Sequence, residues 1–479
     1  DKALRLAKNN VKEGSHEEAK LIYQDILEKF PKNKKAQQGL TALNRPQQSP
    51  AAQSPPQEAI DQLINLYNQG QLGAVVEQAK VLTQQYPEAF IVWNILGATN
   101  TGLGQLDAAV QSYKQAIAIK PDYADAYNNM GITLKELGKL EEAIEAFNKV
   151  LSIKPDSAEA YSNKGNAVKA QGKLEEAIQA YKQALKIKPD SAEIYSNVGN
   201  TLQEQGKLDE AIKAYNKALL LYPDDAEVYY NMGNALKEQG KLEEAIKAYD
   251  KSLSLKPDYS EARHMISALR RETTDKAPRE YVEKLFDQYA VGFESSLIEK
   301  LEYGIPKILA DIMSKQSSNS SFGSILDLGC GTGLFGIEIR NRCDHLEGID
   351  LSKSMINQAK QKNVYHKLTL SDIIEYLSSQ ELNFDYFVAA DVFVYVGNLA
   401  EIFRLVKSKN NRNGKLVFST EHTEKDGFQL QTTGRYSHSK SYIERLCAEF
   451  DYTLSHFSTS NLRKEKGEFI EGGLYILDF

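Results

Sequence analysis

Residues 128–156 read NNMGITLKELGKLEEAIEAFNKVLSIKPD, and a similar segment recurs every 34 residues through much of the first half of the chain. Apolar residues recur at helical spacing on both sides of Gly138-Lys139, which predicts two helices joined by a short turn. The proline at the end cannot continue the second helix and marks the start of the next unit. Prolines at this period are Pro87, Pro121, Pro155, Pro189, Pro223 and Pro257. A fixed period of this length predicts stacked helical units that bury one continuous core.

Aligning the units on this period places small and aromatic side chains in fixed columns. The small columns let paired helices approach closely, and the aromatic columns fill the remaining space. The columns are Gly97, Gly131, Gly165, Gly199 and Gly233; Ala109, Ala143, Ala177, Ala211 and Ala245; Tyr113, Phe147, Tyr181, Tyr215 and Tyr249; and Trp93, Tyr127, Tyr161, Tyr195 and Tyr229. With these columns the units resemble tetratricopeptide repeats, which implies an α-solenoid with a right-handed superhelix.

The repeats are interrupted near the start of the chain. A further repeat-like unit precedes the main array, but Pro31 lies 56 residues before Pro87, so this unit is out of register. The segment between them is rich in Pro, Gln and Ser and predicts an extended linker. The predicted parts are a repeat-like unit at 1–43, the linker at 44–57, an array with a capping helix at 58–271, a helical lead-in at 272–322 and a second domain at 323–479.

Asparagines recur on the first helix of several units, in two rows whose positions lie three residues apart on one helix face. In tetratricopeptide units this face lines the concave groove. A carboxamide both donates and accepts hydrogen bonds, so such rows suit the backbone of an extended peptide. The pattern resembles the asparagine ladder of O-linked N-acetylglucosamine transferase, which implies a protein or peptide partner; a merely solvated groove is the alternative. The rows are Asn129, Asn163, Asn197 and Asn231, and Asn166, Asn200 and Asn234.

From residue 323 onward, short apolar segments alternate with helical segments, which predicts a parallel α/β sheet. The first strand, SILDL at 324–328, runs into the glycine-rich GCGTG at 329–333. The further strands predicted are LEGID, KLTL, FDYFVAAD, GKLVFSTEH, DYTLSHF and GGLYILDF. The sequence therefore predicts a sheet of seven strands.

The glycine-rich segment predicts a tight turn at which a ligand can approach the backbone. Its spacing is G-x-G-x-G, and Asp327 just before it disfavours a pyrophosphate but suits a ligand with an ammonium group. Asp350 ends the second strand, where a carboxylate can accept both hydroxyls of a ribose. Asp372 follows the third strand and suits a purine amino group. An amino acid, a ribose and an adenine in series describe S-adenosylmethionine.

Over roughly residues 275–479 the chain resembles class I S-adenosylmethionine-dependent methyltransferases, through ILDLGCGTG, GIDLS, SDI and FVAADVFVYV. The resemblance implies a Rossmann-like fold and S-adenosylmethionine as cofactor. It implies that Asp327 and the loop backbone hold the methionine part and that Asp350 holds the ribose. The loop residues are Gly329, Cys330, Gly331 and Gly333, and the adenine residues are Leu351, Met355, Asp372 and Ile373. Residues 281–297 resemble the cap of small-molecule methyltransferases, which implies a cofactor contact from Tyr281 or Tyr289.

Candidates for catalysis lie after the fourth and fifth strands. Asp391 ends the fourth strand, beside the point where open sheets bind their ligands, and is either an active-site residue or a structural carboxylate. After the fifth strand come His422, Tyr436 and His438. The two histidines are general-base candidates because imidazole titrates near neutral pH, with a structural role as the alternative. A carboxylate acceptor would need no base, whereas a hydroxyl or an amine would have to lose a proton.

Composition excludes several other classes of protein. The net charge of -7 and the pI of about 5.7 argue against a nucleic-acid partner. Three cysteines, Cys330, Cys343 and Cys447, fit neither a disulfide framework nor a zinc site, so we expect no metal and a reducing, cytoplasmic compartment. We find no run of 18 apolar residues, so no membrane span is expected.

The whole chain resembles bacterial methyltransferases that carry tetratricopeptide repeats and whose substrates are unassigned. The first hypothesis is an enzyme that methylates a protein or peptide recruited or presented by the solenoid. The second is a small-molecule methyltransferase with the repeats as a docking arm. The third is a non-catalytic scaffold.

Overall fold

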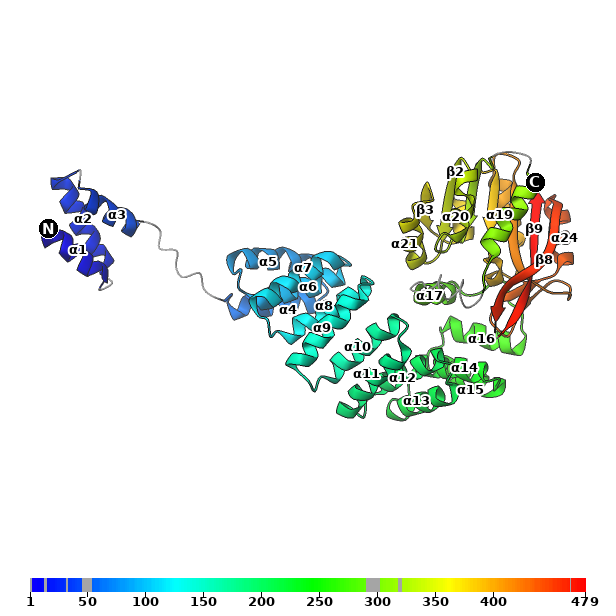
Figure 1. Ribbon diagram of the computed structural model, residues 1–479, viewed down its shortest axis with the longest axis horizontal. Coiled ribbons are helices and arrows are strands. Elements are labelled where there is room, and N and C mark those ends of the chain that lie inside the picture. The colour runs from blue at the N-terminus through cyan, green and yellow to red at the C-terminus, as the bar shows by residue number, and fades with distance from the viewer. Residues whose placement is uncertain are drawn as a thin grey trace. The chain divides into compact units, whose positions relative to one another are not determined.

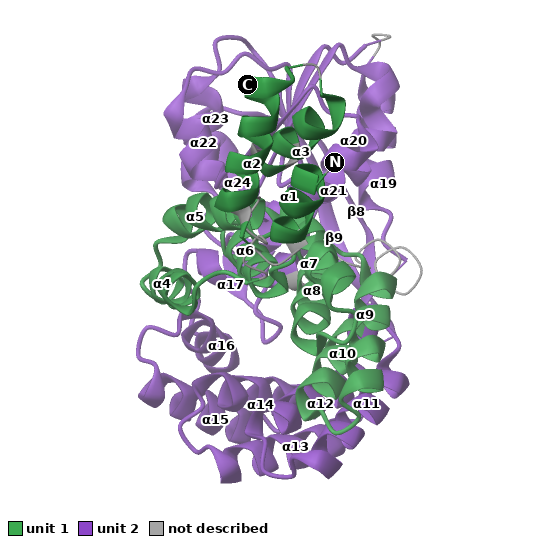
Figure 2. Ribbon diagram, turned by 90° about the vertical axis from the view of Figure 1, so that its left-hand side faces the viewer, with its two compact units in different colours: residues 1–167 green, residues 168–479 purple. Residues whose placement is uncertain are grey.

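The computed structural model describes residues 2–12, 15–31, 33–44, 54–289, 302–317, 321–465 and 467–479. It divides into two compact units, residues 1–167 and 168–479 (Figure 2). The described part of the first unit contains helices and no strand, whereas the second unit adds a sheet (Figure 1).

The first unit is built from helix pairs. Its helices are α1 (Lys2–Lys12), α2 (His16–Lys29), α3 (Lys34–Asn44), α4 (Gln57–Asn68), α5 (Leu72–Gln85), α6 (Phe90–Gly102), α7 (Leu106–Ile119), α8 (Ala124–Glu136), α9 (Leu140–Ile153) and α10 (Ala158–Ala170), the last of which crosses into the second unit. The predicted turn between paired helices is present at Gly138, whose φ of 73° lies in the left-handed region that favours glycine.

The second unit continues the helix pairs and then changes to alternating strands and helices. The repeat helices are α11 (Leu174–Ile187), α12 (Ala192–Glu204), α13 (Leu208–Leu221), α14 (Ala226–Glu238), α15 (Leu242–Leu255) and α16 (Ser260–Arg270). After them come α17 (Arg279–Tyr289), α19 (Ile305–Gln316), β1 (Ser324–Leu328), α20 (Leu334–Ile339), η2 (Arg340–Arg342), β2 (His345–Asp350), α21 (Lys353–Lys362), β3 (Lys367–Leu370), α22 (Ile373–Ser379), β4 (Tyr386–Ala389), η3 (Phe393–Tyr395), α23 (Ala400–Lys409), β5 (Lys415–His422), β6 (Phe428–Leu430), β7 (Tyr436–His438), α24 (Lys440–Phe450), β8 (Thr453–Glu465) and β9 (Glu468–Asp478).

The small and aromatic columns pack against each other within each helix pair. A Cβ added at Gly131 would lie 2.7 Å from the ring of Phe147, and one at Gly199 would lie 2.5 Å from the ring of Tyr215. Both rings are fully buried. The glycine column is therefore needed because an aromatic ring of the second helix occupies the space of its side chain.

The sheet has the order β3-β2-β1-β4-β5-β7-β6 in the described residues, with β9 antiparallel to β5 and β8 antiparallel to β9. The seven strands predicted from the sequence are all present. The predicted count was nevertheless wrong, because two more strands, β6 and β7, make nine. Each is only three residues long and lies in a polar segment without alternating hydrophobicity, so no strand pattern marked them.

Helices cover both faces of the sheet, because consecutive residues of the central strands are buried and point to opposite faces. On β5, Leu416 and Phe418 pack with α22, α23 and α24, whereas Val417 packs with α19 and α20. The neighbours of β1 lead in opposite directions, to β2 and β3 on one side and to β4 on the other. Ligands of open α/β sheets bind at such a switch point, at the carboxyl ends of the strands.

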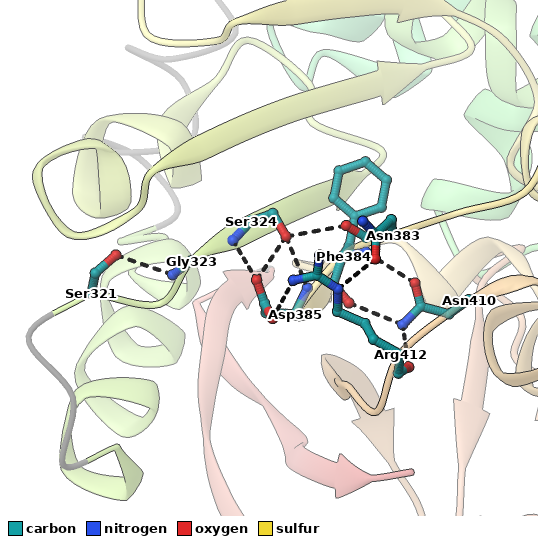
Figure 3. A network of polar contacts seen from close by, with 8 residues as sticks. All are labelled: Ser321, Gly323, Ser324, Asn383, Phe384, Asp385, Asn410 and Arg412. Carbon is teal, nitrogen blue, oxygen red and sulfur yellow. Dashed lines mark hydrogen bonds and ion pairs between the residues drawn. The ribbon is translucent and has the colours of Figure 1, made fainter.

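The amino ends of the central strands are held by a polar network at the opposite edge (Figure 3). The carboxylate of Asp385 accepts hydrogen bonds from the backbone N–H and the hydroxyl of Ser324, at 2.8 and 2.7 Å, and pairs with Arg412 at 2.9 Å. Asn410 accepts from the N–H of Phe384 at 2.9 Å. These contacts fix β1 against β4 and leave the carboxyl ends of both strands for a ligand.

The last repeat helix packs directly onto the α/β domain within the second unit. His264 of α16 donates to the carbonyl of Gly434, between β6 and β7, at 2.9 Å. The hydroxyls of Thr274 and Tyr436 lie 2.5 Å apart, and the N–H of Ala277 donates to the carbonyl of Tyr395 at 3.0 Å. Across the described chain, no helix combines the length and the apolar character that crossing a membrane requires.

Candidate active site

A cavity lies at the carboxyl ends of β1, β2 and β4, where the sheet topology predicts a ligand site. One side of the cavity is formed by the glycine-rich loop and the segments after β2 and β3. The other side is formed by the segment after β4, by α17 and by two arginines. The lining includes Asp327, Gly329, Cys330, Gly331, Asp350, Leu351, Asp372 and Ile373, and also Val282, Phe286, Tyr303, Asp391, Tyr395, Arg435 and Arg463.

The glycine-rich loop is tied to β2. The N–H of Gly331 donates to Oδ2 of Asp350 at 2.8 Å, and the N–H of Cys330 donates to the carbonyl of Ile349 at 2.8 Å. Gly329 has a φ of 71°, and a Cβ there would lie 2.6 Å from Val392. Glycine is therefore required at this turn, and the loop backbone is held open toward the cavity.

Two buried carboxylates face the cavity beside this loop. Asp327 accepts from the hydroxyl of Tyr365 at 2.6 Å, and burial raises the pKa of Asp327 to about 7. Asp350 also accepts from the N–H of Ser352 at 2.8 Å, and burial raises the pKa of Asp350 to about 6. Neither carboxylate forms an ion pair with any residue that the structure describes. Both would be stabilised by a ligand that brings an ammonium group and hydroxyls, so the donor set fits S-adenosylmethionine.

The expected adenine residues are only partly at the cavity. Asp372 lines it and caps α22, accepting from the N–H of Ile374 at 2.8 Å, and Leu351 and Ile373 line it as well. Met355 and Gly333, by contrast, are not among the described lining residues. Met355 lies in α21 with its side chain fully buried, and the missing Cβ of Gly333 makes room for the ring of Tyr365 at 3.0 Å. The structure therefore does not bring Met355 and Gly333 to the cavity lining, and the cofactor contacts expected of them stay predictions.

Helix α17 covers one side of the cavity with Val282 and Phe286. Oδ1 of Asp287 accepts from the hydroxyl of Ser352 at 2.5 Å, which ties the helix to the segment after β2. Tyr281 does not line the cavity, because its ring packs against His264 with centroids 5.1 Å apart. Tyr289 ends α17, and its side chain lies outside the described residues.

At the other end of the cavity, Asp391 belongs to a buried charge cluster. Its φ of 59° is left-handed, and its N–H donates to the hydroxyl of Ser419 at 2.8 Å. Both of its carboxylate oxygens accept from Nη1 of Arg463 at 3.0 Å. Arg463, only 3% exposed, also pairs with Glu421. Asp391 is thus at the cavity as predicted, with its carboxylate engaged by a guanidinium.

A second arginine, Arg435, lines the cavity next to this cluster. Its Nη1 donates to Glu465 at 3.0 Å and lies 3.9 Å from Glu421. The hydroxyl of Tyr395 lies within hydrogen-bonding reach of the same guanidinium. Burial raises the pKa of both Tyr395 and Tyr303, so these tyrosines face the cavity as neutral hydroxyls.

The structure does not bring His422, Tyr436 or His438 to the cavity, since none of the three is among the described lining residues, and their catalytic roles stay predictions. His438 is fully buried and donates through Nε2 to the carbonyls of Val396 and Gly397, and burial lowers its pKa to about 4. Tyr436 is fully buried against Thr274. His422 lies 3.2 Å from Glu424 and packs on Phe457.

Sequence reasoning missed Arg463 and Tyr365. Arg463 lies in β8, in the stretch STSNLRKE, where nothing distinguishes it from the other charged residues of an edge hairpin. Tyr365 precedes β3 in a polar segment. That the side chain of Arg463 points inward from its strand can be recognised only once the strand pairing is known.

The asparagine rows differ in their surroundings. In the first unit, Asn163 donates to the carboxamide of Asn128 at 3.0 Å, and Asn129 donates to that of Asn94 at 3.3 Å. In the second unit, Asn200 accepts from the hydroxyl of Tyr215 at 2.8 Å, and Asn234 accepts from Tyr249 at 2.7 Å. Asn166, Asn197 and Asn231 are half-buried. Asn200 and Asn234 thus accept from buried tyrosine hydroxyls within their own repeats, and peptide binding by these two residues stays a prediction.

Three family models match the chain. The C-terminal domain of cilia and flagella-associated protein 70 matches residues 65–269, the tetratricopeptide repeat matches residues 3–33, and the methyltransferase domain matches residues 319–468. The chain thus combines tetratricopeptide repeats with a C-terminal methyltransferase domain.

Several curated methyltransferases match part of the chain. A malonyl-[acyl-carrier protein] O-methyltransferase of Bacillus anthracis is 27% identical over 186 residues, which cover 35% of this chain and 67% of the relative. A ubiquinone biosynthesis O-methyltransferase of Rickettsia akari is 30% identical over 135 residues, which cover 27% of this chain and 51% of the relative. The crystal structure of MamA is 28% identical, covers 34% of this chain and 95% of that chain, and superposes with a TM-score of 0.32.

Proposed function

Because the chain joins tetratricopeptide repeats to a class I methyltransferase domain, we propose that it transfers the methyl group of S-adenosylmethionine to an acceptor that the repeats recruit or present. The observation that carries the proposal is a single cavity whose lining includes both the residues proposed to bind the methyl donor and those proposed to bind the acceptor. Asp327 and Asp350 lie at one end of it, and Asp391 and Arg435 lie at the other.

The proposed donor end is assigned by the chemistry of its side chains. Asp327 and the loop backbone would hold the amino acid part, Asp350 the ribose, and Asp372 with Ile373 the adenine. When bound, S-adenosylmethionine supplies a methyl group on a positively charged sulfur, which is displaced in line. Among the described residues, neither carboxylate has a cationic partner, which supports this assignment because a bound cation would offset the cost of keeping them charged. They argue against the scaffold hypothesis.

The chain's own residues would align the reactants and exclude water. Val282 and Phe286 of α17 give the cavity an apolar wall, and Asp287 holds that wall against the donor end. A dry cavity strengthens the attraction between the bound cation and the carboxylates. Since displacement at a methyl group needs alignment above all, we assign catalysis mainly to positioning.

The leading acceptor is a protein or peptide, held in part by the first asparagine row. Asn129 and Asn163 in the first unit, and Asn197 and Asn231 in the second, lie on first helices and are only partly buried. Removing either pair by double alanine substitution should weaken capture of the partner from lysate. Unchanged capture by both double variants would leave the ladder without support.

A small-molecule acceptor is the second candidate, favoured by the apolar wall of α17 and the tyrosines at the acceptor end. One experiment distinguishes a protein acceptor from a small-molecule acceptor. Lysate is incubated with the protein and S-adenosylmethionine carrying a tritiated methyl group, and the label is measured in protein and small-molecule fractions. Label in the protein fraction supports the leading hypothesis. The names of both relatives specify O-methyl transfer, which supports an oxygen acceptor in either case.

Donor binding is tested by calorimetry with S-adenosylmethionine. Asp350→Asn should weaken binding by about 10- to 100-fold, because a hydrogen bond to a charged group contributes about 1.5–3 kcal/mol. Asp451→Asn is the matched control, since the Asp451 side chain is 99% exposed and pairs only with Lys407 among the described residues. Equal affinity in the two variants would contradict the assigned donor site.

A further inference from the structure

We infer that the acceptor atom is an oxygen of a carboxylate, and that Arg435 is the residue that binds this carboxylate. The inference rests on the proposed methyl transfer and specifies the chemical class of the group that accepts the methyl. Three features of the cavity carry it: the lack of an available base, the pair of tyrosines and the difference between Arg435 and Arg463.

The first feature is the lack of an available base at the acceptor end, as far as the described residues go. Asp391 accepts from Arg463 through both carboxylate oxygens, so no oxygen lacks a cationic partner. Glu421 is bound by the same guanidinium. His422 and His438 do not line the cavity. An acceptor that had to lose a proton before reacting would find no group here in a position to take it.

The second feature is the pair of tyrosines. Tyr303 and Tyr395 line the cavity beside Asp391, and burial raises the pKa of both. A neutral phenol hydroxyl can donate a hydrogen bond but is a poor proton acceptor. Both residues therefore suit an anionic acceptor better than a protonated amine.

The third feature is the difference between the two arginines. Arg463 is 3% exposed, and its partners are the carboxylates of Asp391 and Glu421. The Arg435 side chain is 26% exposed; it pairs with Glu465, itself 31% exposed, at 3.0 Å, and lies 3.9 Å from Glu421. A guanidinium has five N–H donors and binds carboxylates in a bidentate way. Because the half-buried Glu465 is partly open to solvent, an incoming carboxylate can share or replace its contact with Arg435 at low cost.

A carboxylate also completes the chemistry without a base. The new oxygen–carbon bond forms from an oxygen lone pair as the carbon–sulfur bond breaks, and the sulfur keeps the bonding electron pair. The carboxylate becomes a neutral methyl ester, the sulfonium becomes a neutral thioether, and no proton moves. A hydroxyl or an ammonium group would have to release a proton during the same step.

The inference is tested by the alkali stability of the bond that joins the transferred methyl group to its acceptor in lysate. Tritiated product from the labelling experiment is treated with mild alkali, which hydrolyses methyl esters to volatile methanol but leaves methyl ethers and methylamines intact. Release of most of the label as methanol supports a carboxylate acceptor. Label that resists alkali overturns the inference and leaves the proposed function standing. No transferred label at all overturns both.

Binding provides a readout that does not depend on turnover. Calorimetry compares hexanoate with its neutral analogue hexanamide, in the presence of saturating S-adenosylhomocysteine. The wild-type protein should bind hexanoate at least tenfold more tightly, and Arg435→Gln should abolish this preference. Arg435→Lys should keep part of it, which separates loss of charge from loss of fold. Arg445→Gln is the matched control, because Arg445 pairs with Asp426 away from the cavity.

Two results would overturn the binding site. One is equal affinity of the wild-type protein for hexanoate and hexanamide. The other is an Arg435→Gln variant that still binds S-adenosylhomocysteine and still prefers hexanoate.

Discussion

The affinity of the proposed donor site should depend strongly on pH between 6 and 7.5. Burial raises the pKa of Asp327 to about 7 and that of Asp350 to about 6 in the free protein. An acid with a raised pKa is protonated as the pH falls through that value, and a protonated carboxyl no longer attracts an ammonium group. Donor binding should therefore weaken as the pH is lowered, and binding near pH 7 should release protons.

The size of the effect follows from the fraction of each group that is ionised. From pH 7.5 to pH 6 the ionised fraction falls about eightfold for Asp327 and about twofold for Asp350, at the pKa values given. Affinity should then fall about 15-fold if the ligand binds only the ionised forms. Calorimetry at three pH values, repeated in two buffers of different ionisation enthalpy, measures both the affinity and the protons released.

The control for this prediction is Asp327→Asn, which removes the group with the higher pKa. This variant should bind the donor more weakly at all pH values and should retain only the twofold change that belongs to Asp350. A wild-type affinity that changes less than threefold between pH 6 and pH 7.5 would refute the reasoning. So would a variant with an undiminished pH dependence.

Two predictions concern stability, measured by urea unfolding. Gly199→Ala should lower the free energy of unfolding of the repeats by about 1–3 kcal/mol, because the added Cβ would lie 2.5 Å from the ring of Tyr215. Gly73→Ala is its control, since a Cβ there meets nothing within 4 Å, and equal losses in both variants would contradict the packing account. Arg463→Met should cost about 3–5 kcal/mol, because it removes the cation bound by Asp391 and leaves the buried Glu421 with Arg435 at 3.9 Å as its remaining described cation. A loss below about 1 kcal/mol would mean that these carboxylates do not depend on the arginine.

The features that the sequence predicted well are those that a short segment determines. The repeat period places Gly131 against Phe147 within one helix pair, and the glycine-rich loop directly follows the strand that ends at Leu328. Both patterns are complete within some 35 residues, so no knowledge of distant pairing is needed. The donor end of the cavity was predictable for the same reason.

The acceptor end was not predictable, because it depends on contacts between distant segments. Asp391 and Arg463 are 72 residues apart in sequence and meet only through the pairing of β5 with β9 and of β9 with β8. His438 is a histidine in a polar segment, which suggested a base. The short strand β7 instead turns it inward, where it donates to two backbone carbonyls. Strand pairing therefore decided which of the charged side chains reach the cavity.

Helix α17 is held on two sides, by Lys284 against Glu261 of the last repeat helix at 2.5 Å and by Asp287 against Ser352. The last repeat helix thereby supports the apolar wall of the cavity. A fragment cut at the start of the sheet would keep the glycine-rich loop and forfeit that wall. Removal of α16 would take away the partner of Lys284, whereas removal of an upstream repeat would leave both of these contacts of α17 in place.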